Sequence, residues 1–334
     1  MAAKKKPTPA PSAQLELGAP APPAPAVAPT PQADSPGARP VLYLVDGSGY
    51  IFRAFYAIRR MTASNGQATN AVFGFTTMLL KVLKEHAPDH IAIAFDPGGK
   101  NFRHELYPEY KANRSAPPEE LPPQIPLIHQ LVEHLGITKV VVKGFEADDV
   151  LGTLARQAEA QGYDVVIITG DKDLMQLVDA HTSLIDELRM QKGQSDTSVI
   201  RREQVIAKFG VPPERVVDVL ALAGDSSDNV PGVRGIGEKT AAELVNQWGD
   251  LESVLGHADD VKQPSRREKL KADAEAARLS KRLVTIRDDV PLGLTVAELR
   301  YRGPDRAALL KLFNLLEFRR IINDPFVRGA AAGA

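Results

Sequence analysis

Four short apolar runs, separated by segments of helical periodicity, restrict the fold of this sequence more than any other feature. The runs begin at Val41, His90, Lys139 and Asp164, and polar residues hardly interrupt them. Continuous apolar runs of this length are typical of strands buried on both faces of a parallel sheet. Strands that alternate with helices predict a doubly wound α/β domain with a mostly parallel sheet flanked by helices.

The helical segments are recognised by apolar side chains at helical spacing. Val72, Phe75, Leu79 and Val82 follow the pattern of one helical face. Similar patterns occur near residues 125–135, 150–158, 216–223 and 241–248, and residues 264–286, which are rich in Lys and Arg, also look helical. No comparable strand pattern appears after about residue 213, so we expect the second part of the chain to be mainly helical.

The ends of the chain and its composition exclude several classes of protein. Residues 1–39 are rich in Ala and Pro, with few large apolar side chains, which predicts disorder. No apolar run approaches the length of a membrane span. Lys4-Lys5-Lys6 precedes Pro and Ala rather than the apolar core of a secretory signal. We therefore expect a cytoplasmic protein that does not enter a membrane.

Acidic side chains follow each predicted strand. In a doubly wound sheet, ligands bind outside the carboxyl ends of the strands, so these acids should lie at one edge. Any single one of these acids would ordinarily be the N-cap of the next helix. Independent N-caps, however, poorly explain why four strands end in the same way. With two acids from residues 224–229, nine converge: Asp46, Asp96, Glu146, Asp148, Asp149, Asp171, Asp173, Asp225 and Asp228.

This concentration of carboxylates predicts a metal site. Like charges at close range are unfavourable unless a cation lies among them. The chain has no cysteine, and oxygen ligands alone favour Mg²⁺ or Mn²⁺ over zinc. Nine carboxylates fit two ions about 4 Å apart, the arrangement that stabilises both oxygens in phosphoryl displacement. Calcium storage is disfavoured because the acids do not come from a single EF-hand loop.

Residues 100–114 interleave cations with tyrosines. On a helix, one face would carry Arg103, Tyr107, Tyr110, Lys111 and Arg114. Pro108 argues against a regular helix, so we expect the segment to order when it binds a ligand. Cations beside tyrosines suit phosphates and stacked bases, and a solvated charged loop is the alternative.

A glycine-rich turn at residues 232–237 precedes a predicted helix. Its backbone N–H groups and the helix N-terminus favour an anion such as phosphate. A Gly-x-Gly pattern is weak by itself, but Arg234, Lys239 and Thr240 beside it indicate a helix-hairpin-helix, which grips the DNA backbone without reading sequence. The net charge is −1, yet nine of the 42 acids belong to the cluster. The rest of the chain is therefore basic, with 41 Lys and Arg.

Taken together, these motifs resemble a known family. They are Val45-Asp46-Gly47, Phe95-Asp96, Phe102-Arg103-His104, residues 110–114, Glu146-Ala147-Asp148-Asp149, residues 169–173, residues 224–229 and residues 231–240. In this order, over roughly residues 40–325, they resemble the 5′→3′ exonuclease domain of bacterial DNA polymerase I, within the flap endonuclease superfamily.

The resemblance implies an architecture and an activity. The fold would be a PIN-like α/β domain over residues 40–213 with a helical arch at about 97–123. A helix-hairpin-helix subdomain would follow over residues 214–325, with a frayed tail at 326–334. The activity would be two-metal hydrolysis, leaving a 5′-phosphate, at 5′ ends, flaps, nicks and RNA primers. It also implies a monomer with a functional link to a DNA polymerase and a ligase.

The resemblance further implies roles for single residues. One metal ion would be held by Asp46, Asp96, Glu146 and Asp148. The other would be held by Asp173, Asp225 and Asp228, with Asp171 between the two ions. Asp149 belongs to the motif without an assigned contact. The cations Arg103, Lys111 and Arg114 would steer and polarise the scissile phosphate. Tyr110 would stack on a base, and Arg53 matches a basic position of the first helix.

The hairpin residues complete these expectations. Gly232, Arg234, Gly235, Gly237, Lys239 and Thr240 would contact DNA, with a K⁺ ion held by backbone carbonyls. The family domain usually continues into a polymerase, whereas this sequence ends soon after Phe318, which fits either a stand-alone nuclease or part of a longer chain. Two other functions stay open: an RNase H-like nuclease restricted to RNA in hybrids, and a non-catalytic binder of branched DNA.

Overall fold

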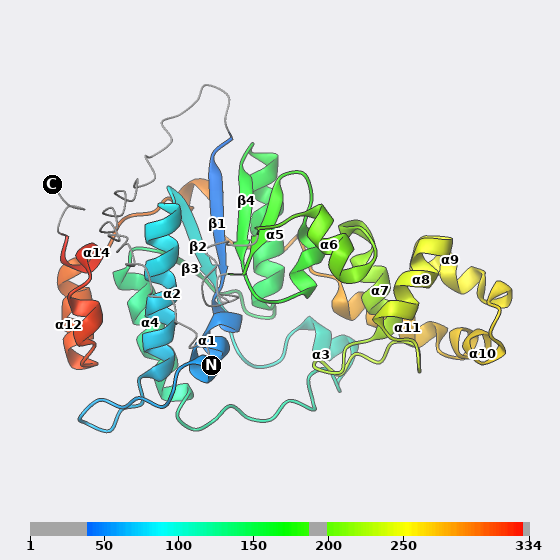
Figure 1. The fold of residues 1–334 in the computed structure, drawn as a ribbon, viewed down its shortest axis with the longest axis horizontal. Coiled ribbons are helices and arrows are strands. Elements are labelled where there is room, and N and C mark those ends of the chain that lie inside the picture. The colour runs from blue at the N-terminus through cyan, green and yellow to red at the C-terminus, as the bar shows by residue number, and fades with distance from the viewer. Residues whose placement is uncertain (1–38, 187–198, 330–334) are drawn as a thin grey trace, which may run out of the picture. The chain divides into compact units, whose positions relative to one another are not determined.

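A six-stranded sheet forms the centre of the computed structural model, which describes residues 39–186 and 199–329 (Figure 1). Its strands are β1 (Val41–Asp46), β2 (His90–Ala94), β3 (Thr138–Val140), β4 (Asp164–Ile168), β5 (Thr182–Ile185) and β6 (Val199–Ile200). The order is β3-β2-β1-β4-β5-β6, and only β6 runs antiparallel to its neighbour. The predicted, mostly parallel sheet is confirmed, and β5 and β6 add two strands that the sequence analysis did not predict.

β1 lies at the point where the strand order reverses. It pairs in parallel with β2 on one side and with β4 on the other, and Asp46 stands opposite Ala94 of β2. In such sheets the ligand site is the crevice outside the carboxyl ends of the strands at this point. The residues that follow β1, β2 and β4 are therefore neighbours in space.

Helices cover both faces of the sheet. Leu42 and Leu44 of β1 pack into one hydrophobic cluster with α5 (Ala147–Ala160). Val45 of β1 packs into a second cluster. That cluster includes side chains of α1 (Gly47–Ala57), α2 (Asn70–His86) and α4 (Ile125–His134). Alternate side chains of one strand thus enter opposite layers, as period-two geometry requires.

The region after β6 is helical, as predicted. It contains α6 (Arg202–Phe209), α7 (Val216–Ala223), α8 (Glu238–Trp248), α9 (Leu251–Gly256), α10 (Pro264–Ala272) and α11 (Ala274–Val284). Short 3₁₀ turns connect parts of the chain: η1 (Pro122–Gln124), η2 (Asp173–Leu177), η3 (Pro213–Arg215), η4 (Ala258–Asp260) and η5 (Val296–Leu299). The basic segment 264–286 forms two helices, which meet at Asp273.

The C-terminal helices return to the α/β layers. They are α12 (Arg306–Leu315), α13 (Arg319–Ile322) and α14 (Pro325–Arg328), and Figure 1 shows α12 and α14 beside α2 and α4. Phe313 and Val327 are fully buried in the same cluster as Val45. We expected residues up to 325 in the helical subdomain and a frayed tail from 326. The apolar faces of these short helices instead complete the layer over α4.

The segment expected to form a helical arch is only partly helical. α3 (Phe102–Leu106) is its single α-helix, and turns occupy residues 108–113. Pro108 follows the last helical turn directly, in agreement with the constraint that proline imposes. None of the helices in the described ranges has both the length and the apolar character that a membrane crossing requires. The predicted disordered tail lies outside the described residues, except for Arg39.

Candidate active site

Eight of the nine predicted carboxylates gather at the carboxyl edge of the sheet. Six of them line one small cavity of about 60 Å³: Glu146, Asp148, Asp171, Asp173, Asp225 and Asp228. Asp46 and Asp96 are close enough to raise the pKa of Asp148 by repulsion. Residues more than one hundred and seventy positions apart thus meet, as the sheet-edge argument predicted.

Asp46 caps α1 and is buried at the end of β1. One carboxylate oxygen accepts a hydrogen bond from Gly49 N (2.8 Å), and the other accepts one from Thr169 Oγ1 (2.9 Å). Burial raises the pKa of Asp46 to about 6, although both hydrogen bonds oppose the shift. Repulsion from Asp171 and Asp96 adds to the rise. Asp46 is therefore both an N-cap and a member of the acidic cluster.

Asp148 and Asp173 are poorly compensated members of the same cluster. Burial raises the pKa of Asp148 well above its ordinary value, and four acidic neighbours raise it further. Burial, with repulsion from Asp171 and Asp225, raises the pKa of Asp173 to about 7. Asp173 Oδ1 is buried without a hydrogen-bond partner among the described residues. An unpartnered oxygen within an all-oxygen set of mutually repelling acids fits the ligand chemistry of a divalent cation such as Mg²⁺.

Cations from residues 110–114 neutralise part of this charge. Lys111 Nζ contacts Glu146 Oε1 (2.5 Å) and Asp228 Oδ2 (3.5 Å), so one ammonium joins the two predicted ligand sets. Arg114 also pairs with Asp228. In the described parts of the chain, no three Asp, Glu or His side chains are grouped closely enough to hold a metal ion in this arrangement.

Backbone contacts fasten the same segment to residues 225–229. Lys111 N donates to Asp228 O (2.9 Å), and Asn113 Nδ2 donates to Ser226 O (2.6 Å). Asn229 Nδ2 donates to Glu109 O (2.7 Å) in return. Lys111 adopts a left-handed backbone conformation with φ of 56°, which is uncommon for a residue with a side chain. The segment thus closes the small cavity from one side.

Tyr110 lies inside this closure. Its side chain is 4% exposed, and its hydroxyl donates to Glu146 Oε2 (3.0 Å) or Asp228 Oδ2 (3.1 Å). The face needed for stacking on a base is therefore covered in this arrangement. The predicted contact with a base requires residues 110–114 to move.

Asp149 is separated from the other acids by its partners. It is fully buried, and Arg103 binds both of its oxygens at 2.7 and 2.8 Å. Backbone N–H groups of Arg287 (2.9 Å) and Glu146 (3.1 Å) donate to the same carboxylate. Four donors satisfy it, so it has no free oxygen for a metal ion. Arg103 is 3% exposed, lines the small acidic cavity and also contacts Glu146 Oε2 (3.5 Å). The carboxylate of Asp149 is thus already satisfied by protein donors, and the phosphate contact of Arg103 stays a prediction.

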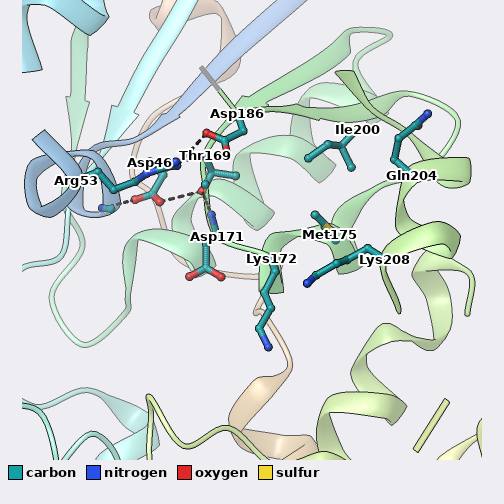
Figure 2. Close-up of a pocket in the computed structure, with 12 residues that line it drawn as sticks. Asp46, Arg53, Thr169, Asp171, Lys172, Met175, Asp186, Ile200, Gln204 and Lys208 are labelled. Atoms are coloured by element: carbon teal, nitrogen blue, oxygen red, sulfur yellow. Dashed lines mark hydrogen bonds and ion pairs between the residues drawn. The ribbon is translucent and has the colours of Figure 1, made fainter. Parts of the chain in front are cut away.

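A second, larger cavity of about 600 Å³ shares Asp171 with the small one, and Figure 2 shows the residues that line it. Arg53 crosses its rim and forms an ion pair with Asp186 (2.9 Å). A Cβ atom at Gly170 would lie 1.4 Å from Arg53 Nη1, so a side chain at this position would displace the Arg53 guanidinium. This cavity was not predicted from the sequence. The sequence did contain a signal for the cavity. Asp186 directly follows Leu184 and Ile185 at the end of β5, just as the predicted acids follow their strands.

The glycine-rich turn has the geometry expected of a hairpin. Val233 and Ile236 anchor it in the core, while Arg234, Gly235, Gly237 and Lys239 are exposed and Thr240 is half-buried. Gly232 is buried, with φ of 61°, and its N–H donates to Ser280 Oγ (2.9 Å). A Cβ atom on Gly232 would lie 2.4 Å from Gly224 N. Gly232 therefore shapes the turn, and Arg234 on its surface forms an ion pair with Asp273 (2.8 Å).

Two family models match the chain in sequence. Residues 41–210 match the model described as 5′-3′ exonuclease, N-terminal resolvase-like domain. Residues 211–307 match the model described as 5′-3′ exonuclease, C-terminal SAM fold. The junction between the models lies just after α6, close to the boundary that the sequence analysis placed at residue 213.

Relatives and solved structures agree with these matches. The DNA polymerase I of Rhizobium leguminosarum is 45% identical over 285 residues, which cover 83% of this chain and 27% of that protein. A structure described as T5 5′-exonuclease with bound divalent metal ions (zinc) has a TM-score of 0.60 at 18% identity, covering 86% of this chain and 97% of that one.

The catalytic core of Rad2 in complex with DNA substrate gives a TM-score of 0.58 at 14% identity, covering 86% and 93% of the two chains. At these identities, the structural likenesses concern the fold alone. The chain spans between a quarter and a third of the length of the curated relatives that it matches.

Proposed function

The chain belongs to the 5′-3′ exonuclease family, and from this premise we propose that it hydrolyses phosphodiester bonds at 5′ ends, flaps and RNA primers of duplex DNA. The observation that carries the proposal is the cluster of eight carboxylates at the switch point of the sheet, with Lys111 and Arg114 directly over it. The carboxylates can bind divalent metal ions, and the adjacent Lys and Arg side chains can bind a phosphate. Phosphoryl transfer requires this combination.

Two Mg²⁺ or Mn²⁺ ions are the proposed cofactors. The first would be held by Asp46, Asp96, Glu146 and Asp148. The second would be held by Asp173, Asp225 and Asp228, with Asp171 between the two. When bound, such ions activate water and neutralise charge on the phosphoryl group. Asp149 is omitted from the set because Arg103 and two backbone N–H groups already satisfy its oxygens.

The side chains over the cluster are proposed to exchange partners when DNA enters. Lys111 and Arg114 would leave Glu146 and Asp228 and bind the scissile phosphate, where their charges orient it for in-line attack by water without a covalent intermediate. The same movement would uncover Tyr110 for stacking on a base. Arg103 would act indirectly, because it would hold the start of α5, which carries Asp148.

DNA would be held chiefly by its backbone. Arg234 and Lys239 beside the exposed glycines of the hairpin suit duplex phosphates, and backbone carbonyls of the turn would hold a K⁺ ion. The Rad2 core, which shares the fold, is described in complex with DNA substrate. We further propose that the chain acts as a monomer in concert with a DNA polymerase, because the matched relatives are DNA polymerases I, and with a ligase.

A magnesium titration on a 5′-flap DNA labelled at its 5′ end tests the proposal. We expect a labelled flap product to appear with Mg²⁺ and to be absent in EDTA, with a 5′-phosphate left on the downstream strand. Binding without product at every concentration would indicate a branched-DNA binder instead. Cleavage of an RNA-primed duplex but not of the DNA flap would indicate the narrower RNase H-like activity.

A further inference from the structure

We propose that the larger cavity binds one nucleotide of the DNA strand next to the scissile phosphate, with Lys208 as its phosphate ligand. We call it the α6 pocket and define it by Arg53, Lys172, Met175, Ile200, Gln204 and Lys208, which line it together with acids of the sheet edge. This inference rests on the proposed function, because it assumes that a DNA strand reaches the acidic cluster.

The position of the pocket makes it continuous with the candidate active site. Asp171 lines both the small acidic cavity and the α6 pocket, so the two cavities adjoin at this residue. Tyr110, Lys111 and Arg114 form another part of the wall of the small cavity. A strand whose phosphate lies among the acids would therefore have its neighbouring nucleotide beside Asp171, at the mouth of the α6 pocket.

The charges on the wall of the pocket favour a phosphate. Lys208 extends from α6 toward the loop that carries Asp171 and Lys172 (Figure 2). Lys208 forms no ion pair with any described residue, whereas Arg53 is paired with Asp186 and Lys172 with Glu238 (2.5 Å). Asp186 is thus neutralised, and Asp46 and Asp171 belong to the proposed metal set. An exposed lysine without an acidic partner can bind a backbone phosphate without first breaking an ion pair.

The remaining wall suits a base. Met175 and Ile200 form an apolar side of the pocket, and Gln204 lies one helical turn before Lys208 on α6, so both side chains share a face. A volume of about 600 Å³ lies within the range of pockets that bind small ligands, and one nucleotide is such a ligand. Apolar contact with a base is tolerant of sequence, as expected of a nuclease that recognises structure.

The salt dependence of DNA binding tests the assignment of Lys208. The probe is a 5′-flap DNA bound in EDTA, so that no cleavage is needed. Lys208→Ala should weaken binding roughly three- to ten-fold and lower the slope of log affinity against log salt by about one, the value for one phosphate contact. Arg202→Ala is the matched control, because it removes one charge from the same helix but breaks only an exposed pair with Glu214.

A scan of neutral methylphosphonate linkages then locates the contact. For the wild-type protein and Arg202→Ala, one linkage next to the scissile position should weaken binding, and Lys208→Ala should be insensitive to that same linkage. Equal sensitivity of Lys208→Ala and the control at every linkage, with equal salt slopes, would overturn the proposal. If the wild-type protein still cleaves the flap with Mg²⁺ in that case, only the α6 pocket is refuted and the proposed function stands.

Discussion

Arg103 and Asp149 form a bidentate ion pair in the protein interior, with Nη1–Oδ2 and Nη2–Oδ1 distances of 2.7 and 2.8 Å. Arg103 Nε also donates to Leu283 O (2.7 Å), and Arg287 N donates to Asp149 (2.9 Å). The pair therefore joins α3, the first turn of α5 and the segment that follows α11. Asp149 is adjacent to Asp148, so the pair fixes the helix turn that carries a proposed metal ligand.

The first prediction concerns the stability that this pair provides. Arg103→Ala should lower the free energy of unfolding by about 3–5 kcal/mol, because it leaves the Asp149 carboxylate buried without its main partner. Urea unfolding in EDTA measures the effect. A double variant, Arg103→Met with Asp149→Leu, should recover only part of the loss, because it removes the unpaired charge but leaves Leu283 O and Arg287 N without their partners.

Arg114→Ala is the control for this experiment. It removes another arginine–aspartate pair from the same segment, but that arginine is 53% exposed, so the change should have a small effect on stability. Equal stability of Arg103→Ala and Arg114→Ala would show that the buried pair is not a structural link.

The second prediction separates two adjacent aspartates. Asp148→Ala should abolish cleavage of a 5′ flap while leaving DNA binding measurable, because Asp148 belongs to the proposed metal set. Asp173→Ala should behave in the same way. Asp149→Asn should lower stability but retain cleavage by the folded fraction, because Asp149 bonds to Arg103 instead. Full activity in the Asp148 variant, or loss of activity in a fully folded Asp149 variant, would contradict the assignment.

Sequence patterns predicted the parallel sheet and the acidic edge, because apolar runs and strand ends are local features. They grouped Asp149 with Asp148, although the two side chains leave α5 in different directions, and neighbours on a helix do not share a face. Which of them meets Arg103 depends on residues 283–287, which are far away in the sequence. Local patterns also could not place α12 to α14. Their short apolar faces could pack on any layer, and only the contact with α4 in the folded protein selects one.

The third prediction concerns Lys111, which contacts both proposed ligand sets. Lys111→Ala should bind Mn²⁺ more tightly in the absence of DNA, since Glu146 and Asp228 lose a competing cation. The same variant should lower the turnover of flap cleavage more than the affinity for duplex DNA. Calorimetric titration with Mn²⁺ and single-turnover kinetics measure the two effects. Weaker metal binding together with unchanged turnover would remove Lys111 from the site.

Lys139→Ala provides the comparison for Lys111. This lysine pairs with Glu133 (2.7 Å) on the surface, so its removal changes the net charge equally without affecting the acidic cluster. Its metal affinity and turnover should match those of the wild-type protein, which separates a local effect of Lys111 from a change in overall charge.

The last prediction follows from the raised pKa values of Asp46, about 6, and Asp173, about 7. In an unfolded chain an aspartate loses its proton near pH 3.9. Between that value and about pH 7 the folded state binds more protons, so these two groups make the free energy of unfolding fall as the pH rises. Their stabilising contribution is complete below about pH 4 and is lost by about pH 7.

Asp173→Asn isolates this contribution because asparagine does not titrate. In EDTA, the variant should be more stable than the wild-type protein at pH 8, and the difference should shrink toward pH 5. Mg²⁺ should stabilise the wild-type protein most at pH 8, where the carboxylates are ionised, and should stabilise the variant less. Urea unfolding across this range measures both effects, with the exposed Asp260→Asn as the control. A wild-type protein that is more stable than Asp173→Asn in EDTA at pH 8 would show that the cluster is not under electrostatic strain without metal.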